Sequence, residues 1–327
     1  MNSSAEYSAS STPCARTLVI TVCTNCSRSI PTPHPDRLRP RSWPTAPTES
    51  RDRLRGVAVR SGRSGGARRV VAGDTSLEVI VEGAGAPLVL IQTGLLAEEC
   101  APLATALSRD FTTVRYHRRG YAGSDPVTGP GSIVRDARDC AALLGALAVD
   151  SAHVLGLSYS GAVAVQLAAD APELVRSLIL IEPPPVHVAE FRAVTGELQR
   201  EYRVAGGAVA LAHLMGIVSG PDWRDILDRQ LPGARAQATA DAGTFFATDL
   251  PALLNWTFTA AEAARVRAPV LYLGGTASGP WFAEVHARIT QWFPRAESVL
   301  VDGADHGLAL THAAALATAI TAFAAQR

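Results

Sequence analysis

From Arg68 to the end of the chain, short runs of apolar residues alternate with longer stretches of helical periodicity. The run at 86–94, APLVLIQTG, is almost continuously apolar until it ends in a glycine turn, and similar runs occupy 151–158, 177–185 and 268–275. Strands of this kind are buried on both faces, as in a parallel sheet that helices cover on both sides. The pattern predicts an α/β fold with a mainly parallel sheet and helices on both faces.

Helical stretches separate these strands and also close the chain. They are expected at 97–110, 132–149, 159–172 and 311–325. Four further strands complete the expected sheet: 68–73, 76–83, 111–116 and 296–303.

The rhythm of strand and helix stops between 185 and 265. This segment holds several helical stretches and no convincing strand, so we expect a helical cap inserted between two strands of the sheet. The expected core therefore comprises residues 68–184 and 266–327, with the cap at 185–265.

Residues 1–67 differ in composition from the rest. They are rich in Ser, Pro, Arg and Thr and hold ten Arg against four acidic residues, although the whole chain has a net charge of zero. Such a stretch buries too little apolar surface to offset its ordering entropy, so a disordered basic extension is expected. A transit peptide or a start codon placed too far upstream would look the same.

Several classes of protein are excluded by composition. The chain has no Lys, so a mechanism through a lysine Schiff base is impossible. Residues 68–327 are mildly acidic and therefore lack the basic surface that nucleic-acid binding requires. The Cys23–Cys26 pair is a lone CxxC without a second half-site, and we read it as incidental. No run is long and apolar enough to span a membrane, and Thr17–Cys23 lacks a following cleavage site, so a cytoplasmic protein without a membrane role is expected.

The stretch 153–165, HVLGLSYSGAVAV, joins an expected strand to an expected helix. Gly156, Ser160 and Gly161 bracket Ser158 with small residues, as a sharp turn between crowded backbones requires. In that setting the serine hydroxyl projects above the carboxyl end of the sheet, and Ser158 is the candidate nucleophile.

A serine nucleophile needs a base, and the base needs an orienting carboxylate. His306 follows a late strand in LVDGADHGLAL and is better placed for this role than the other histidines. The acid is expected to be Glu182, which ends the strand next to that of Ser158 and is followed by three prolines. Asp302 and Asp305 are the fallback candidates.

An oxyanion formed during acyl transfer also needs hydrogen-bond donors. The backbone N–H groups of Tyr159, which follows the nucleophile, and of Leu95, in the turn after 86–91, are expected to supply them.

These motifs resemble the α/β-hydrolase fold family over roughly Arg68 to Arg327. The likeness rests on the GLSYSG turn, on YHRRGYAGSD at 116–125 and on the late DGADHG histidine. It implies a serine hydrolase of esterase type, with the order Ser158, Glu182, His306 as nucleophile, acid and base.

The chain departs from the family pattern at four places. His117 stands where an Asp is usual, Thr93 where His is common, and Ser160 where Gly is common. Ser278 stands where the acid usually lies, which is why the acid is sought at Glu182, a position used by some members of the family.

We expect cleavage of an ester, thioester or lactone of a small to medium apolar substrate, through an acyl-enzyme on Ser158. Phe246, Trp256 and Trp281 are expected to line the substrate pocket, and no metal or cofactor is expected. Arg118 and Arg119 could meet a substrate carboxylate, although structural salt bridges are favoured.

Two other functions stay open at this point. The same three residues could support carbon–carbon bond hydrolysis or cofactor-free perhydrolysis. The missing acid at Ser278 would instead suit a non-catalytic small-molecule binder of the same fold.

Overall fold

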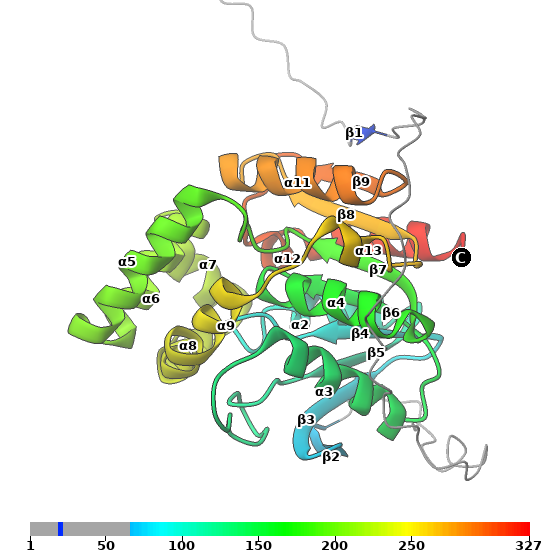
Figure 1. Cartoon of the computed structure of the whole chain (residues 1–327), viewed down its shortest axis with the longest axis horizontal. Helices are drawn as coiled ribbons and strands as arrows, with labels where there is room; N and C mark the ends of the chain where they lie inside the picture. Colours follow the sequence, from blue (N-terminus) through cyan, green and yellow to red (C-terminus); the bar gives the residue numbers. More distant parts are fainter. Residues whose placement is uncertain (1–18, 22–65) are drawn as a thin grey trace, which may run out of the picture.

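The computed structural model describes residues 19–21 and 66–327. Its sheet has the strand order β1-β9-β8-β7-β6-β4-β5-β3-β2 (Figure 1). The strands are β1 (Val19–Thr21), β2 (Arg68–Ala72), β3 (Thr75–Glu82), β4 (Ala86–Ile91), β5 (Phe111–Tyr116), β6 (Ala152–Leu157), β7 (Val175–Ile181), β8 (Val270–Gly275) and β9 (Glu297–Val301).

Strands β4 to β9 pair in parallel, while β1, β2 and β3 pair antiparallel at the two edges. Every residue of the central strand β6 is buried, and so is every residue of β7 except Arg176. The continuous apolar runs of the sequence are therefore the strands buried on both faces, and the predicted fold class is confirmed.

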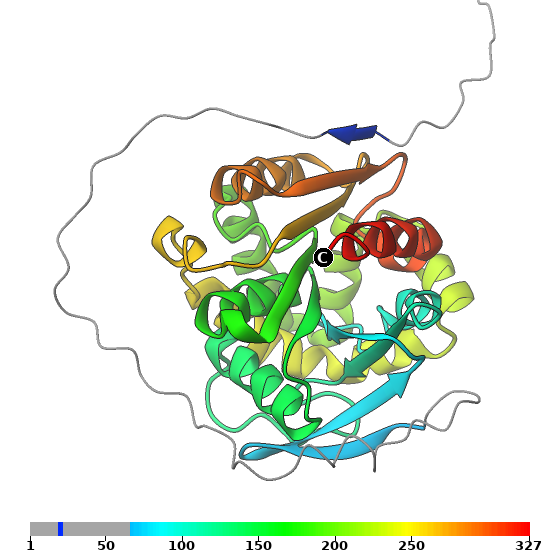
Figure 2. The ribbon, with the colours of Figure 1, turned by 90° about the vertical axis from the view of Figure 1, so that its right-hand side faces the viewer.

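Helices cover both faces of the sheet. In Figure 2, α3 (Ile133–Ala146), α4 (Tyr159–Asp170) and α11 (Pro280–Trp292) lie on one side, and α2 (Ala101–Leu107) and α13 (Ala313–Ala324) on the other. Two separate apolar clusters, one on each face, form the core. The sheet order reverses at β4, whose neighbours are β5 and β6, and ligands of open α/β sheets bind outside the carboxyl ends of strands at such a point.

The chain between β7 and β8 is helical and lies beside the carboxyl ends of the strands (Figure 1). Its elements are α5 (Ala189–Ala205), α6 (Gly207–Val218), α7 (Trp223–Gln230), α8 (Ala234–Thr244), the π-helix η2 (Phe245–Asp249), α9 (Leu250–Asn255) and α10 (Ala260–Ala263). These helices have an apolar cluster of their own, which Leu95, Leu96 and Leu310 of the core complete. Two short elements remain: η1 (Pro172–Leu174) before β7 and α12 (Leu308–Thr311) before α13.

The predicted disordered extension, 1–67, lies almost wholly outside the described residues, as do Cys23 and Cys26. Its three described residues near the start, Val19–Thr21, form β1 and pair with β9. Within the described part of the chain, no helix is both long and apolar enough to cross a membrane.

Candidate active site

The chain turns sharply at Ser158, between the end of β6 and the first residue of α4. Its backbone has φ 49° and ψ −122°, a conformation that non-glycine residues rarely adopt. A Cβ on Gly156 would lie 2.4 Å from the carbonyl oxygen of Ser160, and one on Gly161 would lie 2.6 Å from Cβ of Pro183. The small residues around Ser158 therefore have a steric cause.

Ser160 takes the place of a common glycine without obstructing the turn. Its hydroxyl donates to the carbonyl oxygen of Leu157 and accepts from the N–H of the same residue, both at 2.9 Å. The side chain is folded back onto the turn and fully buried, so it braces the strand end that carries Ser158.

Glu182 and His306 are joined by a short hydrogen bond. Glu182 Oε2 lies 2.7 Å from Nδ1 of His306, and Glu182 Oε1 accepts from the N–H of Gly275 at 2.8 Å. The carboxylate is completely buried. It can therefore orient the imidazole while the end of β8 holds it in place.

The sheet order explains why a glutamate at this point reaches the histidine. Strand β7 lies between β6 and β8, so its carboxyl end is next to the strand end that carries Ser158. Glu182 has φ 40°, which turns the chain out of the strand immediately before the three prolines.

The other candidate acids are engaged elsewhere. Asp302 accepts a hydrogen bond from Thr276 Oγ1 at 3.2 Å, and Asp305 accepts one from the N–H of Gly307 at 2.9 Å. Ser278, at the usual place of the acid, has a buried hydroxyl with no hydrogen-bond partner among the described residues.

The surroundings of His306 favour a charged imidazole. Burial alone would lower the pKa of His306, but the hydrogen bond and charge of Glu182 raise it above the ordinary value. The charges of Glu99 and Asp305 act in the same direction. The ring also stacks on Phe282, with centroids 4.3 Å apart, which fixes its plane.

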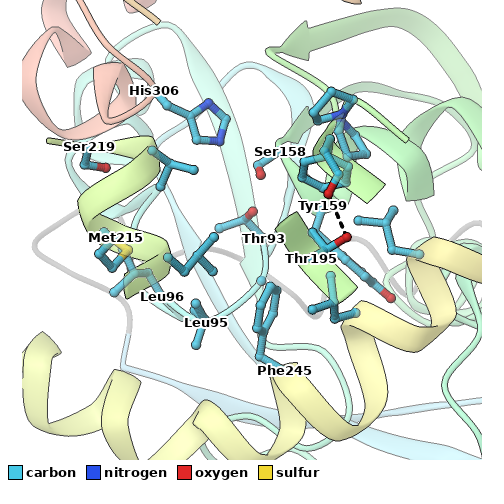
Figure 3. A pocket seen from close by; sticks show the side chains of 18 of the residues that line it. Thr93, Leu95, Leu96, Ser158, Tyr159, Thr195, Met215, Ser219, Phe245 and His306 are labelled. Carbon is cyan, nitrogen blue, oxygen red and sulfur yellow. Dashed lines mark hydrogen bonds between the residues drawn. The ribbon is translucent and has the colours of Figure 1, made fainter. Parts of the chain in front are cut away.

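Ser158 and His306 line one cavity of about 90 Å³ and face each other across it (Figure 3). No hydrogen bond joins these two side chains. Catalytic hydrogen bonds often tighten only when substrate is bound, so this separation is compatible with a nucleophile and its base.

The two expected oxyanion donors differ in their availability. Tyr159 is the first residue of α4, where a backbone N–H has no acceptor within the helix. The N–H of Leu95 already donates to the hydroxyl of Tyr121 at 3.3 Å, and that hydroxyl donates to Asp249 at 2.7 Å. Leu95 could serve an oxyanion only by giving up its present acceptor.

Backbone strain is concentrated at this site. Five described non-glycine residues have positive φ, and three of them are Leu95, Ser158 and Glu182. Residues held in such conformations cluster at active sites, where the surrounding structure enforces them.

Arg118 lies under the site and is nearly completely buried. It pairs with Asp249 of η2 at 2.5 Å and with Asp136 of α3 at 2.9 Å. Arg119 pairs in the same way with Asp139 at 2.6 Å. Both arginines therefore form structural salt bridges, and neither lines the cavity of Ser158.

The Arg118 network reaches both sides of the cavity. Arg118 donates to the carbonyl oxygens of Gln92 and Thr93, which precede Leu95. Asp136 accepts from the hydroxyl of Tyr159 at 2.9 Å. The network thus ties the loop after β4 and the start of α4 to the cap.

The cavity is mainly apolar, and the aromatic residues that line it are only partly those expected from the sequence. Trp281 is among the lining residues, together with Phe191, Phe245 and Phe282. The expectation that Phe246 and Trp256 line it is wrong.

Both corrections have physical reasons. Phe246 stacks on Tyr202 inside the cap, with centroids 5.3 Å apart, because adjacent residues of a helix point in different directions. Trp256 donates to Gln166 Oε1 of α4 at 2.9 Å and lines a separate cavity.

Sequence reasoning missed Glu99, which lines the cavity near His306. Burial raises the pKa of Glu99 to about 7, with His306 opposing that shift and Asp305 adding to it. Among the described residues that line this cavity, Glu99 is the one acid and none is an arginine. A carboxyl group facing an apolar cavity next to the histidine is a signal that only the fold provides.

Among the described residues, no group of three or more His, Cys, Asp or Glu side chains could hold a metal ion.

Known proteins resemble the chain in sequence. A family model described as alpha/beta hydrolase fold matches residues 87–209. The 2-(acetamidomethylene)succinate hydrolase of Mesorhizobium japonicum is 30% identical over 257 residues, which cover 73% of this chain and 88% of that protein. A protein of Azorhizobium caulinodans with the name "Putative carbamate hydrolase RutD" is 37% identical over 110 residues, which cover 33% of this chain and only 42% of RutD.

Solved structures resemble it in fold. The enol-lactonase of Burkholderia xenovorans LB400 superposes with a TM-score of 0.67 and 21% identity, over 78% of this chain and 99% of the lactonase. At that identity the likeness concerns the fold alone.

Proposed function

This chain belongs to the α/β-hydrolase fold family, and from that membership we propose that it is a serine hydrolase that cleaves esters, thioesters or lactones of small to medium apolar substrates through an acyl-enzyme on Ser158. The observation that carries the proposal is the buried Glu182–His306 pair, 2.7 Å apart, opposite Ser158 in one cavity.

In the first half of the reaction, His306 Nε2 takes the proton of Ser158 as the hydroxyl oxygen attacks the carbonyl carbon. Glu182 accepts the hydrogen bond of Nδ1–H and stabilises the imidazolium. The carbonyl π-bond electrons move to oxygen, and the Tyr159 N–H donates to the oxyanion. The oxyanion then collapses, the bond to the leaving group breaks, and the imidazolium gives its proton to that group.

In the second half, the same imidazole takes a proton from water, and the resulting nucleophile attacks the acyl carbon. A second oxyanion forms and collapses, the acid product leaves, and Ser158 regains its proton from His306. Each proton that the histidine takes is returned, so no other acid or base is required.

We expect the cavity to favour substrates that carry no carboxylate, because its one acidic lining residue among those described is Glu99. Glu99 is partly buried in the wall of the cavity that His306 also lines, and the described lining residues offer no arginine to bind an anion. Above about pH 7, where Glu99 is mostly ionised, it would repel a substrate carboxylate in a site of low dielectric. The M. japonicum relative acts on a succinate by name, and the two carboxylates of a succinate are disfavoured in a cavity that holds Glu99 and, among its described lining residues, no arginine.

The alternative of a non-catalytic binder depended on the lack of an acid at Ser278. Glu182 provides a carboxylate to His306 from another strand, and this supports catalysis instead.

The proposal is tested by the hydrolysis of short-chain 4-nitrophenyl esters. The wild type should turn over the acetate and the butyrate, and Ser158→Ala should reduce turnover to background. Ser108→Ala, at a serine whose hydroxyl donates to the carbonyl oxygen of Thr105 at the surface, is the matched control. Equal turnover by wild type and Ser158→Ala would refute the proposed nucleophile.

A further inference from the structure

The oxyanion needs a second hydrogen-bond donor beside the N–H of Tyr159. Leu95 N–H donates to Tyr121, and the next N–H, that of Leu96, donates to the carbonyl oxygen of Gly94 at 2.8 Å. With φ 65° at Leu95, Gly94 to Leu96 form a tight three-residue turn in which the N–H groups of Leu95 and Leu96 are already bonded.

The hydroxyl of Thr93 lies in the same wall of the cavity. Thr93 is 2% exposed, and the side-chain hydrogen bond that reaches it in the described part of the chain ends on its carbonyl oxygen and not on Oγ1. Thr93 lines the cavity together with Ser158 and Tyr159, and its hydroxyl points toward the Ser158 hydroxyl in Figure 3. A hydroxyl that faces a cavity can donate a hydrogen bond to an atom of a bound ligand.

The backbone of Thr93 is held firmly. Its carbonyl oxygen accepts from Arg118 at 3.2 Å, and the carbonyl oxygen of the preceding Gln92 accepts from the same guanidinium at 3.0 Å. Arg118 is itself fixed by Asp249 and Asp136. A donor on such a backbone needs little reorganisation when charge develops on the substrate.

We propose that the hydroxyl of Thr93 donates the second hydrogen bond to the oxyanion, beside the N–H of Tyr159. This assignment rests on the proposed serine hydrolase function. It replaces the expected role of the Leu95 N–H, which remains bonded to Tyr121 throughout the reaction.

The alternative is that Leu95 exchanges Tyr121 for the oxyanion when substrate binds. The two assignments differ in what removal of the Tyr121 hydroxyl does. If Leu95 is the donor, Tyr121→Phe frees its N–H and turnover rises or is restored; if Thr93 is the donor, Tyr121→Phe brings no gain.

The test compares wild type, Thr93→Val, Thr93→Ser and the double variant Thr93→Val/Tyr121→Phe on one 4-nitrophenyl ester. Val has nearly the shape of Thr but no hydroxyl, so kcat should fall by about 10²- to 10³-fold while KM changes little, because the donor acts on the oxyanion and not on the bound ester. Thr93→Ser keeps a hydroxyl and should recover the greater part of that loss. The double variant should be no faster than Thr93→Val.

A boronic acid inhibitor gives a second readout. It forms a tetrahedral adduct with a nucleophilic serine, so its inhibition constant should rise in Thr93→Val by a factor similar to the fall in kcat. The thermal unfolding midpoint of each variant shows whether a loss of turnover comes from loss of the fold.

The outcomes separate this assignment from the proposed function. If wild type hydrolyses no ester, the proposed function fails. If wild type is active and folded Thr93→Val keeps its kcat, or if Tyr121→Phe restores the double variant, the assignment of Thr93 is wrong and the serine mechanism stands.

Discussion

Glu182 and His306 lie 124 positions apart in the sequence, yet their side chains meet at 2.7 Å at the carboxyl edge of the sheet. The contact joins the end of β7 to the loop after β9, and it gives the histidine the carboxylate that Ser278 does not provide.

Glu182→Gln should lower kcat by about 10³- to 10⁴-fold, because an amide stabilises the imidazolium poorly and can hold the wrong tautomer. Steady-state turnover of a 4-nitrophenyl ester measures the effect. Asp302→Asn, at a fallback acid that bonds to Thr276, is the control and should stay close to wild type. A large fall in kcat for Asp302→Asn, with little change for Glu182→Gln, would identify Asp302 as the acid.

The pH profile of kcat/KM should report the raised pKa of His306. The base must be neutral to take the Ser158 proton, so activity is lost as the pH falls through this pKa. Since Glu182 and the nearby acids raise it, the acid limb should lie above the ordinary histidine value of about 6.5. Glu99→Gln removes one of those charges and should move the limb to lower pH, whereas Glu197→Gln, exposed on α5, should not. A limb that moves upward in Glu99→Gln contradicts this electrostatic assignment.

Wild type should prefer neutral esters to anionic ones of equal length. At pH 8, where Glu99 is largely ionised, kcat/KM for 4-nitrophenyl butyrate should exceed that for 4-nitrophenyl hemisuccinate by about tenfold or more. Glu99→Gln should narrow this ratio mainly by raising kcat/KM for the hemisuccinate. An unchanged ratio would mean that Glu99 does not face the acyl chain.

Phe245→Ala should widen the acyl preference toward longer chains, because the ring lines the cavity and packs against Gly94. The measurement is kcat/KM over esters of increasing acyl length. Trp256→Ala is the matched control, since that residue lines a separate cavity, and its profile should follow wild type. If the acyl-length preference changes in Trp256→Ala but not in Phe245→Ala, Trp256 lines the substrate cavity, as first expected from the sequence.

Asp249→Asn should destabilise the protein, because it leaves the buried Arg118 with one carboxylate in place of two. Removing one partner of a buried ion pair typically costs about 3 to 5 kcal/mol of unfolding free energy, measured by urea denaturation. Asp228→Asn, in an exposed pair with Arg235, should change it little. Equal effects of the two variants would show that the buried pair is not a structural link between cap and core.

The sequence predicted those parts of the site that have local signals. Ser158 is marked by the small residues that its turn requires, and His306 by its place in a loop after a late strand. Glu182 is predicted from its place at the end of an apolar run together with the order of the parallel strands. Each of these predictions depends on a rule that acts over a few residues or on the sheet as a whole.

The parts that sequence could not predict depend on contacts between distant elements. Whether Phe245 or Phe246 faces the cavity is set by the helical phase of η2, which no local pattern reveals. That the Leu95 N–H is taken by Tyr121 requires the loop at 117–125 to pass below it. Glu99 lies within the expected helix 97–110 and carries no local signal of a role in the site, and only the fold brings it into the cavity of His306.

The most direct test of the proposed mechanism is mass spectrometry of the protein after reaction with a fluorophosphonate. An activated Ser158 attacks phosphorus and expels fluoride, so wild type should gain one phosphonyl group on the peptide that contains Ser158. Ser158→Ala should gain none, and Glu182→Gln should react much more slowly. If wild type remains unlabelled, or if the group is found on another residue and persists in Ser158→Ala, the assignment of Ser158, Glu182 and His306 as a catalytic unit is wrong.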